Sequence, residues 1–425
     1  MTRSPRGNPP TPVTPRSPRS RSSMLAGAPL AVFVSIIGLM VIAIGTFAIG
    51  SGDLPFSVVG GKGPGASGDT GPAKTATPSG VVVVPSDVPA GVQVPGTFVY
   101  AKDGNIWLQT NGQATQLTTA GTDSMPSFTA DGKNVLFIRT RTLPGVWPVL
   151  GVPNRYVMNV PSVMEVPTAG GSATRILDGY YNPPGYKKWM NWIREPVLAP
   201  NGRTLAIATD LPDPSKGDVV LKLYDIAKRK LTDPKVPEVP PLGQQDPAWR
   251  PDGAVLAYVY NNRNGAVGAP QIYSYTVATK QARPISGPGY LHPSWSPDGK
   301  YIAVTKTSAY GTDVAIINAS TGAEVSLLTN DGASWGPAWS PVGDQIAYLH
   351  ASGQVVDLKL VVLKGPYGDW QPGDSIDLTQ SAGLDSISRP DWFVPASQMP
   401  AATPAPSTSA PSAPSGSASA APSPS

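Results

Sequence analysis

A stretch of about 14 residues recurs along the chain and places the strongest limit on its fold. The copy from Leu291 to Val304 has the sequence LHPSWSPDGKYIAV. The other copies are MPSFTADGKNVLFI from Met125, EPVLAPNGRTLAIA from Glu195, DPAWRPDGAVLAYV from Asp246, GPAWSPVGDQIAYL from Gly336 and a shorter RPDWF from Arg389. A chain that repeats one short pattern in this way is expected to repeat one structural unit.

Each copy predicts a β-hairpin. The five longer copies contain a Pro, then an aromatic residue or Leu two positions later, a turn ending in Gly, and a hydrophobic strand that in four of them includes Ala. Pairs such as Asp131-Gly132 and Asp298-Gly299 supply the positive φ angles that tight turns need. The repeat prolines are 44 to 70 residues apart, and periods of about 40 to 50 residues are typical of propeller blades. The Val, Ile, Tyr, Trp and Gly in the repeat disfavour a helical solenoid.

The W-S-P-D-G-K-x-I-A pattern resembles the WD40-like (PD40) repeats of the TolB family, found also in the propeller domains of prolyl oligopeptidases and of some actinobacterial lipoproteins. The resemblance covers roughly residues 96–394. It implies an all-β fold, a six-bladed β-propeller over residues 96–395. TolB has an additional N-terminal α/β domain, and this sequence shows no counterpart of it.

The repeats also predict how the ring closes. The sixth copy stops after one strand, at Trp392-Phe393, whereas segments from Gly96, Asn105 and Ala114 have the pattern of the remaining three strands of a blade. The two ends of the domain are therefore expected to share one sheet, which leaves no exposed ring edge. The residues two positions after each Pro are expected to fill the space between blades: Phe128, Leu198, Trp249, Trp295, Trp339 and Trp392.

Composition excludes several classes of function. The 425 residues include no Cys, which excludes disulfides, thiolate nucleophiles, cysteine zinc sites and a lipidated N-terminal Cys. Five of the 32 basic residues are Arg in the first 23 positions. The rest of the chain therefore has 27 basic and 28 acidic residues and is nearly neutral. A neutral body lacks the clustered positive charge that nucleic-acid binding requires, and no nucleic-acid partner is expected.

Residues 24–50 predict a membrane-spanning signal anchor. Leu30–Ile49 provides 20 mostly apolar residues, enough to cross a hydrocarbon layer about 30 Å thick. A cleaved signal peptide is the alternative, but its apolar region would be shorter and followed by a small-x-small site. The Arg/Pro/Ser segment 1–23 precedes the span, so the N-terminus is expected in the cytoplasm and the propeller outside the plasma membrane.

Two segments of low complexity flank the predicted propeller. Residues 51–95 are rich in Gly, Pro, Ser and Val and predict a flexible linker, in which Val81–Val84 could pair as an edge strand. Residues 396–425 are Ala, Pro, Ser and Thr with no charge, a composition that predicts a disordered tail. A stalk that spans the cell wall or carries O-linked sugars is the alternative for this tail.

Two long insertions mark the most promising binding surface. The first, about residues 140–162, lies between the second and third strands of the first blade, and the second, 177–194, leads into the next blade. These connections emerge on one face of a propeller, so the insertions are expected to share one rim, beside Lys187, Lys188 and Arg194. The candidate binding residues on this rim are Trp147, Tyr156, Tyr180, Tyr181, Tyr186, Trp189 and Trp192. Packing of these aromatics onto the blade below is the structural alternative.

The residues that precede the repeat prolines are expected to line the mouth of the central channel. Four of the six are polar: Glu195, Asp246, His292 and Arg389. Such a ring could hold a small polar ligand or a cation, or its members could pair with one another.

One segment matches a catalytic motif. Residues 332–336 read GASWG, which fits the G-x-S-x-G nucleophile pattern around Ser334. That motif requires a strand-turn-helix and a later acid and His, whereas Ser334 leads into a blade strand and only His350 follows it. No metalloprotease or calcium-loop motif occurs, so the sequence predicts no catalytic residue, metal site or cofactor.

Together these features predict a non-catalytic, extracytoplasmic binding scaffold of the bacterial envelope, tethered by its N-terminal helix. The family resemblance implies an envelope protein as partner, since TolB works beside a peptidoglycan-associated lipoprotein. The alternative is an enzyme or a small-ligand sensor that acts on glycans or small polar molecules through the channel mouth.

Overall fold

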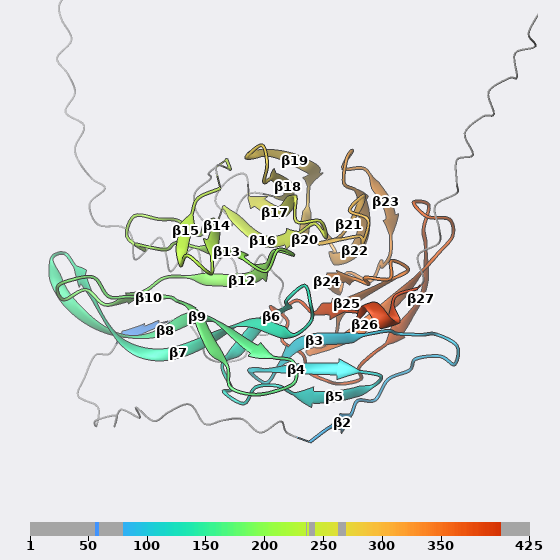
Figure 1. Ribbon diagram of the computed structural model, residues 1–425, viewed down its shortest axis with the longest axis horizontal. Coiled ribbons are helices and arrows are strands. Elements are labelled where there is room, and N and C mark those ends of the chain that lie inside the picture. Colours follow the sequence, from blue (N-terminus) through green and yellow to red (C-terminus); the bar gives the residue numbers. More distant parts are fainter. Residues whose placement is uncertain (1–55, 59–79, 235, 238–242, 262–268, 401–425) are drawn as a thin grey trace, which may run out of the picture.

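The computed structural model describes residues 56–58, 80–234, 236–237, 243–261 and 269–400. Over these residues the chain forms an all-β, six-bladed propeller (Figure 1). The innermost strands of neighbouring blades contact one another around the whole ring, from β6 through β12, β16, β20 and β24 to β28 and back to β6. The predicted fold is thereby confirmed.

Blades two to five are four-stranded antiparallel sheets whose strands follow sequence order. Blade two consists of β12 (Ile193–Leu198), β13 (Thr204–Thr209), β14 (Val220–Asp225) and β15 (Lys230–Thr232). Blade three consists of β16 (Gln244–Trp249), β17 (Val255–Asn261), β18 (Pro270–Thr276) and β19 (Gln281–Pro288). Blade four consists of β20 (Tyr290–Trp295), β21 (Tyr301–Ser308), β22 (Gly311–Asn318) and β23 (Glu324–Leu327). Blade five consists of β24 (Ser334–Trp339), β25 (Gln345–Ser352), β26 (Val355–Lys364) and β27 (Gln371–Asp377).

The first blade is larger than these four. Its own strands are β6 (Asp123–Phe128), β7 (Asn134–Val149), β8 (Val152–Pro167) and β9 (Thr174–Asp178). The short β1 (Phe56–Val58) also pairs with β8, and a two-stranded ribbon of β10 (Tyr180–Tyr181) and β11 (Trp189–Met190) leads into blade two.

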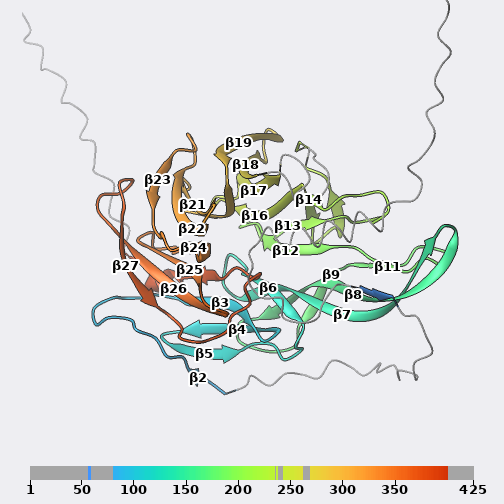
Figure 2. The ribbon, with the colours of Figure 1, turned by 180° about the vertical axis from the view of Figure 1, so that it is seen from behind.

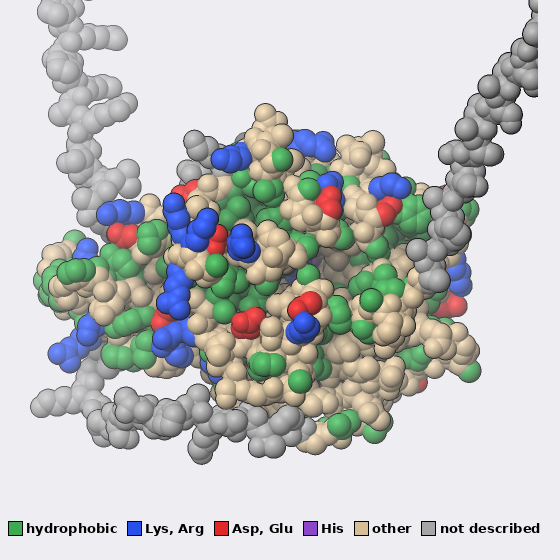
Figure 3. Space-filling model, viewed as in Figure 1, with side chains coloured by type: hydrophobic (Ala, Val, Ile, Leu, Met, Phe, Trp, Pro, Cys, Tyr) green, Lys and Arg blue, Asp and Glu red, His purple; other side chains and the backbone are tan. Residues whose placement is uncertain are grey.

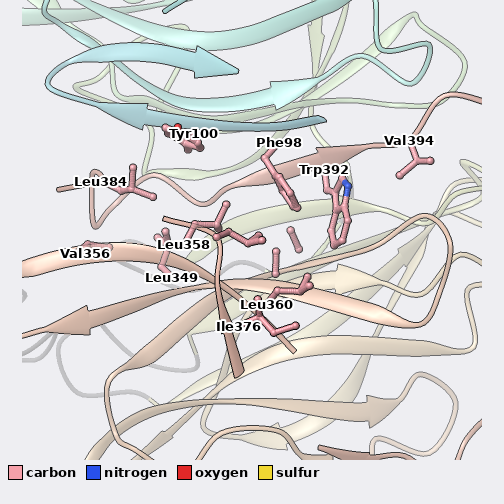
Figure 4. Close-up of a cluster of buried hydrophobic side chains, with 13 residues drawn as sticks. Phe98, Tyr100, Leu349, Val356, Leu358, Leu360, Ile376, Leu384, Trp392 and Val394 are labelled. Carbon is pink, nitrogen blue, oxygen red and sulfur yellow. The ribbon is translucent and has the colours of Figure 1, made fainter. Parts of the chain in front are cut away.

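The sixth blade joins the two ends of the propeller, as the sequence predicts. Its strands are β28 (Asp391–Phe393), β3 (Thr97–Lys102), β4 (Asn105–Thr110), β5 (Gln113–Gln116) and β2 (Val82–Val83). Trp392 of β28 pairs with Phe98 of β3, and its indole Nε1 donates to the carbonyl of Pro95 at 2.8 Å. The rings of Phe98 and Trp392 lie 4.4 Å apart within the hydrophobic cluster that fills the space against blade five (Figure 4). Pairing of β2 with β5 confirms the predicted edge strand near Val81–Val84.

The repeated turns have the predicted geometry. Gly132 and Gly299 have φ of 67° and 69°, where a side chain would be strained. The preceding Asp298 accepts hydrogen bonds from the Lys300 amide at 3.1 Å and from the Ser296 hydroxyl at 2.8 Å. The carboxylate thus fixes the turn locally, which explains why Asp or Asn precedes Gly in four of the repeats.

The core lies between the blades. Four of the hydrophobic repeat strands carry an Ala, and those at Ala257 and Ala303 are fully buried in clusters between neighbouring blades. The indole Nε1 atoms of Trp249 and Trp295 donate to inner-strand carbonyls of the preceding blade at 3.2 and 3.0 Å. Trp339 instead donates within its own turn, to Gly343 at 3.2 Å. The aromatic position of the repeat therefore packs between blades, as predicted.

The remaining described segments lie outside the sheets. A 3-10 helix, η1 (Ala396–Gln398), follows the closing strand, and the Gly96 amide donates to the Gln398 side chain at 2.7 Å. None of the helices among the described residues is long and apolar enough to span a membrane. The predicted anchor at 24–50 and most of the predicted tail lie outside the described residues.

Candidate functional site

The first blade carries a projection, called the arm here, that consists of residues 142–160 and 179–192. Its hairpin is continuous, because β7 and β8 pair from Asn134–Pro167 to Val149–Val152. The inner half of this hairpin is held by β6 and β9, whereas the outer half extends beyond the ring (Figures 1 and 2). The first insertion is therefore an elongation of two blade strands rather than a separate connection.

The second insertion packs against this hairpin. Val146 and Lys188 exchange two backbone hydrogen bonds of 2.8 and 2.9 Å. Nearer the ring, the Gly179 amide donates to Pro161 at 2.9 Å, and the Asn191 amide donates to Gly179 at 2.7 Å. A Cβ at position 179 would lie 2.5 Å from the Pro161 carbonyl oxygen, so only Gly permits this approach. The two insertions do share one side of the molecule.

The rim aromatics form a small core inside the arm. The ring of Trp189 lies 5.6 Å from that of Trp147 and 5.2 Å from that of Tyr156, which is 5% exposed. Their cluster is built on the buried Met158 and Met190. The remaining rim aromatics are Tyr180, Tyr181 and Trp192, which are half-buried, and Tyr186, which is 51% exposed. Most of the seven therefore stabilise the arm, and Tyr186 presents the largest free aromatic surface among them.

The arm is basic. The segments 142–164 and 179–193 contain no Asp or Glu but include Arg155, Lys187 and Lys188. The Lys187 ammonium lies 5.1 Å from the centre of the Trp147 ring, a cation–π contact. At the base, Arg141 is neutralised by Asp178, with Nη2 and Oδ1 2.5 Å apart. A positive field thus remains on the outer part.

The residues before the repeat prolines form β-bulges at the inner strands. Met125, Glu195, Asp246 and His292 have φ between 50° and 54°, and Gly336 has a φ of 62°. The register of each inner strand shifts at this point. A left-handed conformation at a residue other than Gly costs on the order of 1 kcal/mol, so these bulges must be held by other contacts.

Those contacts come from the neighbouring blades. The Asp246 amide donates to Oε2 of Glu195 at 2.6 Å, and the His292 amide donates to Oδ2 of Asp246 at 3.2 Å. The Gly336 amide donates to the Thr305 hydroxyl at 2.9 Å, and His292 Nδ1 lies 3.0 Å from the same oxygen. The structure therefore brings Glu195, Asp246 and His292 together, and each carboxylate supports the bulge of the next blade.

Arg389 lies near this group but in a different backbone setting. Its Nη1 donates to the carbonyl of Pro293 at 3.4 Å, and its charge acts on both Glu195 and His292. Sequence inspection missed Thr305, because its partner Gly336 is a full blade away in the chain. It also missed Ser388, whose hydroxyl accepts from the Met125 amide at 2.9 Å.

Glu195, Asp246 and His292 are called the central group here, and burial shifts the pKa of two of them, Glu195 and His292. Burial, together with the Asp246 carboxylate, raises the pKa of Glu195. Burial, followed by the charge of Arg389, lowers the pKa of His292 to about 3. His292 is therefore neutral at physiological pH, and a neutral imidazole 3.7 Å from Asp246 makes no ion pair with it. The carboxylates serve chiefly as hydrogen-bond acceptors for backbone amides.

Ser334 and His350 do meet, but not as a catalytic triad. The Ser334 hydroxyl lies 3.2 Å from His350 Nδ1 and 2.9 Å from Asp331 Oδ2, and the same Oδ2 lies 3.3 Å from Nδ1. In a triad the acid and the serine contact opposite nitrogens of the imidazole, whereas here both contact Nδ1. Ser334 is also fully buried. This arrangement closes a loop onto blade five and does not activate the hydroxyl.

No cluster of three or more potential metal ligands occurs among the described residues. In the central group, Glu195 and Asp246 each use a carboxylate oxygen to accept a backbone amide. The arm is a solvent-facing feature of the described chain that the ring itself does not require.

Comparison with known proteins agrees with the fold. Residues 187–369 match the family model described as PD40, TolB beta propeller domain. The protein contains a TolB-like six-bladed β-propeller. TolB from Acinetobacter baumannii superposes with a TM-score of 0.52 at 18% identity, over 70% of this chain and 66% of that chain. The chain thus spans slightly less than two thirds of that TolB.

Other solved structures resemble the TolB-like propeller less closely. A putative TolB from Agrobacterium tumefaciens gives a TM-score of 0.46 at 14% identity, over 70% of this chain and 93% of that chain. An oligogalacturonate lyase from Vibrio parahaemolyticus gives 0.40 at 13% identity, over 71% and 99%. No curated protein matches the sequence. At these identities the structural similarities establish the fold alone.

Proposed function

We propose that the protein is a non-catalytic binding scaffold of the bacterial cell envelope. In this proposal residues 24–50 tether the propeller to the plasma membrane, and the propeller faces outward. TolB-like propellers as a family bind other envelope proteins, which supports a protein partner. The hydrogen bonds of the central group also support a scaffold, because Glu195 and Asp246 accept backbone amides of neighbouring blades.

The arm is the observation that carries this proposal. It has its own aromatic core, and its outer hairpin pairs with β1 and with the segment that leads into the second blade. An element of this kind adds nothing to ring closure, but it presents Tyr and Trp side chains beside basic residues. Tyr, Trp and Arg side chains are enriched at the centres of protein interfaces. We infer that a partner protein binds the flank of the arm formed by Tyr181, Tyr186 and Trp192.

Tyr186→Ala tests this site without disturbing the fold, since its side chain is 51% exposed. Crosslinking in cells followed by affinity capture should recover one envelope protein with the wild type, and at least about tenfold less with the variant, as expected for a hot-spot tyrosine. Tyr310→Ala is the matched control, because Tyr310 is 93% exposed at the tip of the blade-four hairpin.

Equal capture by wild type and Tyr186→Ala would show that the flank of the arm is not the binding site. The central group would then become the place to screen for a small polar ligand, because His292 keeps 24% of its side chain exposed beside Asp246. Loss of capture in both tyrosine variants would indicate a general surface effect and would also contradict the proposed site.

A further inference from the structure

The tip of the arm exposes apolar side chains in succession. Val149, Leu150 and Val152 are 37%, 86% and 62% exposed, and Val157 on the same strand is 39% exposed. Leu150 and Gly151 have φ of 51° and 83° and form a tight turn, so this exposure is a fixed feature of the hairpin. Among the described residues, only Val81–Val83 shows a comparable succession of exposed large apolar side chains.

This exposure is not explained by folding of the arm itself. The arm core ends at Trp147 and Tyr156, below the tip. Apolar side chains at the end of a hairpin do not contribute to a core, and they lower solubility unless a lipid membrane or a partner protein covers them. Figure 3 shows the projecting end of the molecule with hydrophobic side chains at its extremity and Lys and Arg side chains beside them.

The charge around the tip indicates what covers it. Arg155, Lys187 and Lys188 lie on the two segments of the arm that contain no acidic residue. Trp147 lies just behind the apolar residues and under the Lys187 ammonium. An apolar end followed by an indole and a belt of cations is the order of groups that an anionic lipid interface accommodates: acyl chains, then the interfacial zone, then phosphates.

The predicted anchor would bring the arm close to the membrane. The backbone of Phe56 pairs with Met158 and that of Val58 with Tyr156, so β1 lies along the outer half of β8. The predicted anchor ends at residue 50, and the six intervening peptide steps reach at most about 20 Å. With this anchor in the bilayer, the point where the chain would leave the membrane lies close to the arm, whereas Val81–Val83 lies on the sixth blade.

We propose that the tip of the arm, residues 148–153, docks into an anionic lipid bilayer and fixes the orientation of the propeller on the membrane. This inference goes beyond the proposed binding of a partner protein, and it relies on the predicted anchor only for proximity to the bilayer. The tip contacts lipid, and Tyr186, which is 51% exposed, remains free to bind protein.

The absence of Cys from the chain allows a direct test. The full-length Leu150→Cys variant is labelled with an environment-sensitive fluorophore and reconstituted into vesicles of phosphatidylglycerol and phosphatidylcholine that contain brominated acyl chains. Tyr310→Cys, at the tip of the blade-four hairpin, is the matched control. We expect a blue-shifted emission at position 150 and quenching at least about twofold stronger than at position 310.

Removing the anionic lipid, or introducing Lys187→Glu with Lys188→Glu, should reduce the quenching at position 150 because the electrostatic attraction is lost. A chain that floats with the vesicles while the label at 150 stays unquenched would overturn lipid docking and leave the anchor intact. A chain that neither floats nor shows quenching would overturn both.

Two further outcomes also contradict the proposal. Equal quenching at positions 150 and 310 would show that the propeller lies on the bilayer without a preferred site. A blue shift at position 150 in native membranes but not in the purified vesicles would assign the tip to a protein partner.

Discussion

The hairpins between the second and third strands of blades one and four occupy the same topological place but have different surroundings. In blade four, β21 and β22 pair over eight residues each, and Val304 and Ile316 are fully buried against neighbouring blades. In blade one, β7 and β8 pair over sixteen residues each, and their outer half pairs with the second insertion and with β1. Strand pairing continues to the tip in both hairpins, but only the outer half of the blade-one hairpin extends beyond the ring (Figure 1).

This difference separates stability from binding. The repeated unit fills the space between blades and cannot change without loss of packing. The arm has its own core and meets the ring through a narrow base, where Gly179 approaches Pro161 and Trp192 meets Asp210. We therefore expect the two regions to respond separately to substitution.

The largest effect is expected at the closing blade. Trp392→Ala removes a side chain that is 5% exposed, packs on Phe98 and donates to Pro95. Truncation of a buried Trp costs about 3–5 kcal/mol, so the free energy of unfolding in urea should fall by about this amount. Deletion of residues 388–394 should have a larger effect because it opens the ring.

Leu150→Ala is the control for this substitution, since its side chain is 86% exposed. Its unfolding free energy should stay within about 0.5 kcal/mol of the wild type. If the two variants were equally stable, the ring would not depend on closure by β28, and the contrast between ring and arm would fail.

A smaller and local effect is expected inside the arm. Met158→Ala removes a fully buried side chain from the arm core. Amide hydrogen exchange should become faster in residues 142–160 and 179–192, because local opening no longer needs to break this core. Exchange in β20–β22 should not change.

The main urea transition should also move less in Met158→Ala than in Trp392→Ala. A variant that accelerates exchange in every blade to the same extent would show that arm and ring unfold as one unit. That result would refute the separation proposed here.

A further effect is expected at the junction of the two regions and depends on pH. Asp210 is 5% exposed, and Oδ1 accepts the Trp192 amide at 2.7 Å. Burial raises the pKa of Asp210 to about 7. The folded protein thus binds a proton more tightly than the unfolded chain, and stability should decrease as the pH rises from about 4 to about 7.

Asp210→Asn keeps an oxygen that can accept the Trp192 amide but removes the titration. Its stability should therefore decrease less than that of the wild type over this pH range, as measured by urea unfolding at pH 5, 6, 7 and 8. Asp252→Asn, at an exposed turn, is the control. Parallel pH profiles for wild type and Asp210→Asn would show that Asp210 does not cause the pH dependence.

Most of the ring could be predicted from the sequence. The turn at Asp298-Gly299, the Pro and the Trp at 295 are signals within one repeat, and the repeat interval then fixes the kind of fold. The closure was predictable because the first and last segments are complementary parts of one blade. The length of the arm was not, since residues 140–162 contain Pro and Gly that are usually found in loops, although here they lie in two paired strands.

The candidate site shows a different limit. The sequence identified Glu195, Asp246 and His292 as one group, because each precedes a repeat Pro. It could not identify what they contact, since the amide that Glu195 accepts belongs to a residue 51 positions away. It likewise predicted that the rim aromatics lie together, but not that Tyr156 is buried while Tyr186 is exposed.

The sequence by itself therefore determined the blade, the number of copies and the join between the chain ends. Each of these depends on turn preferences and alternation between residues that are close in the chain. Only the tertiary structure decided that the central carboxylates support bulges, that most rim aromatics form a core, and that the apolar tip at Leu150 stays exposed. Burial and pairing are set by what neighbouring blades and insertions place around a side chain, and those neighbours are tens of residues distant in sequence.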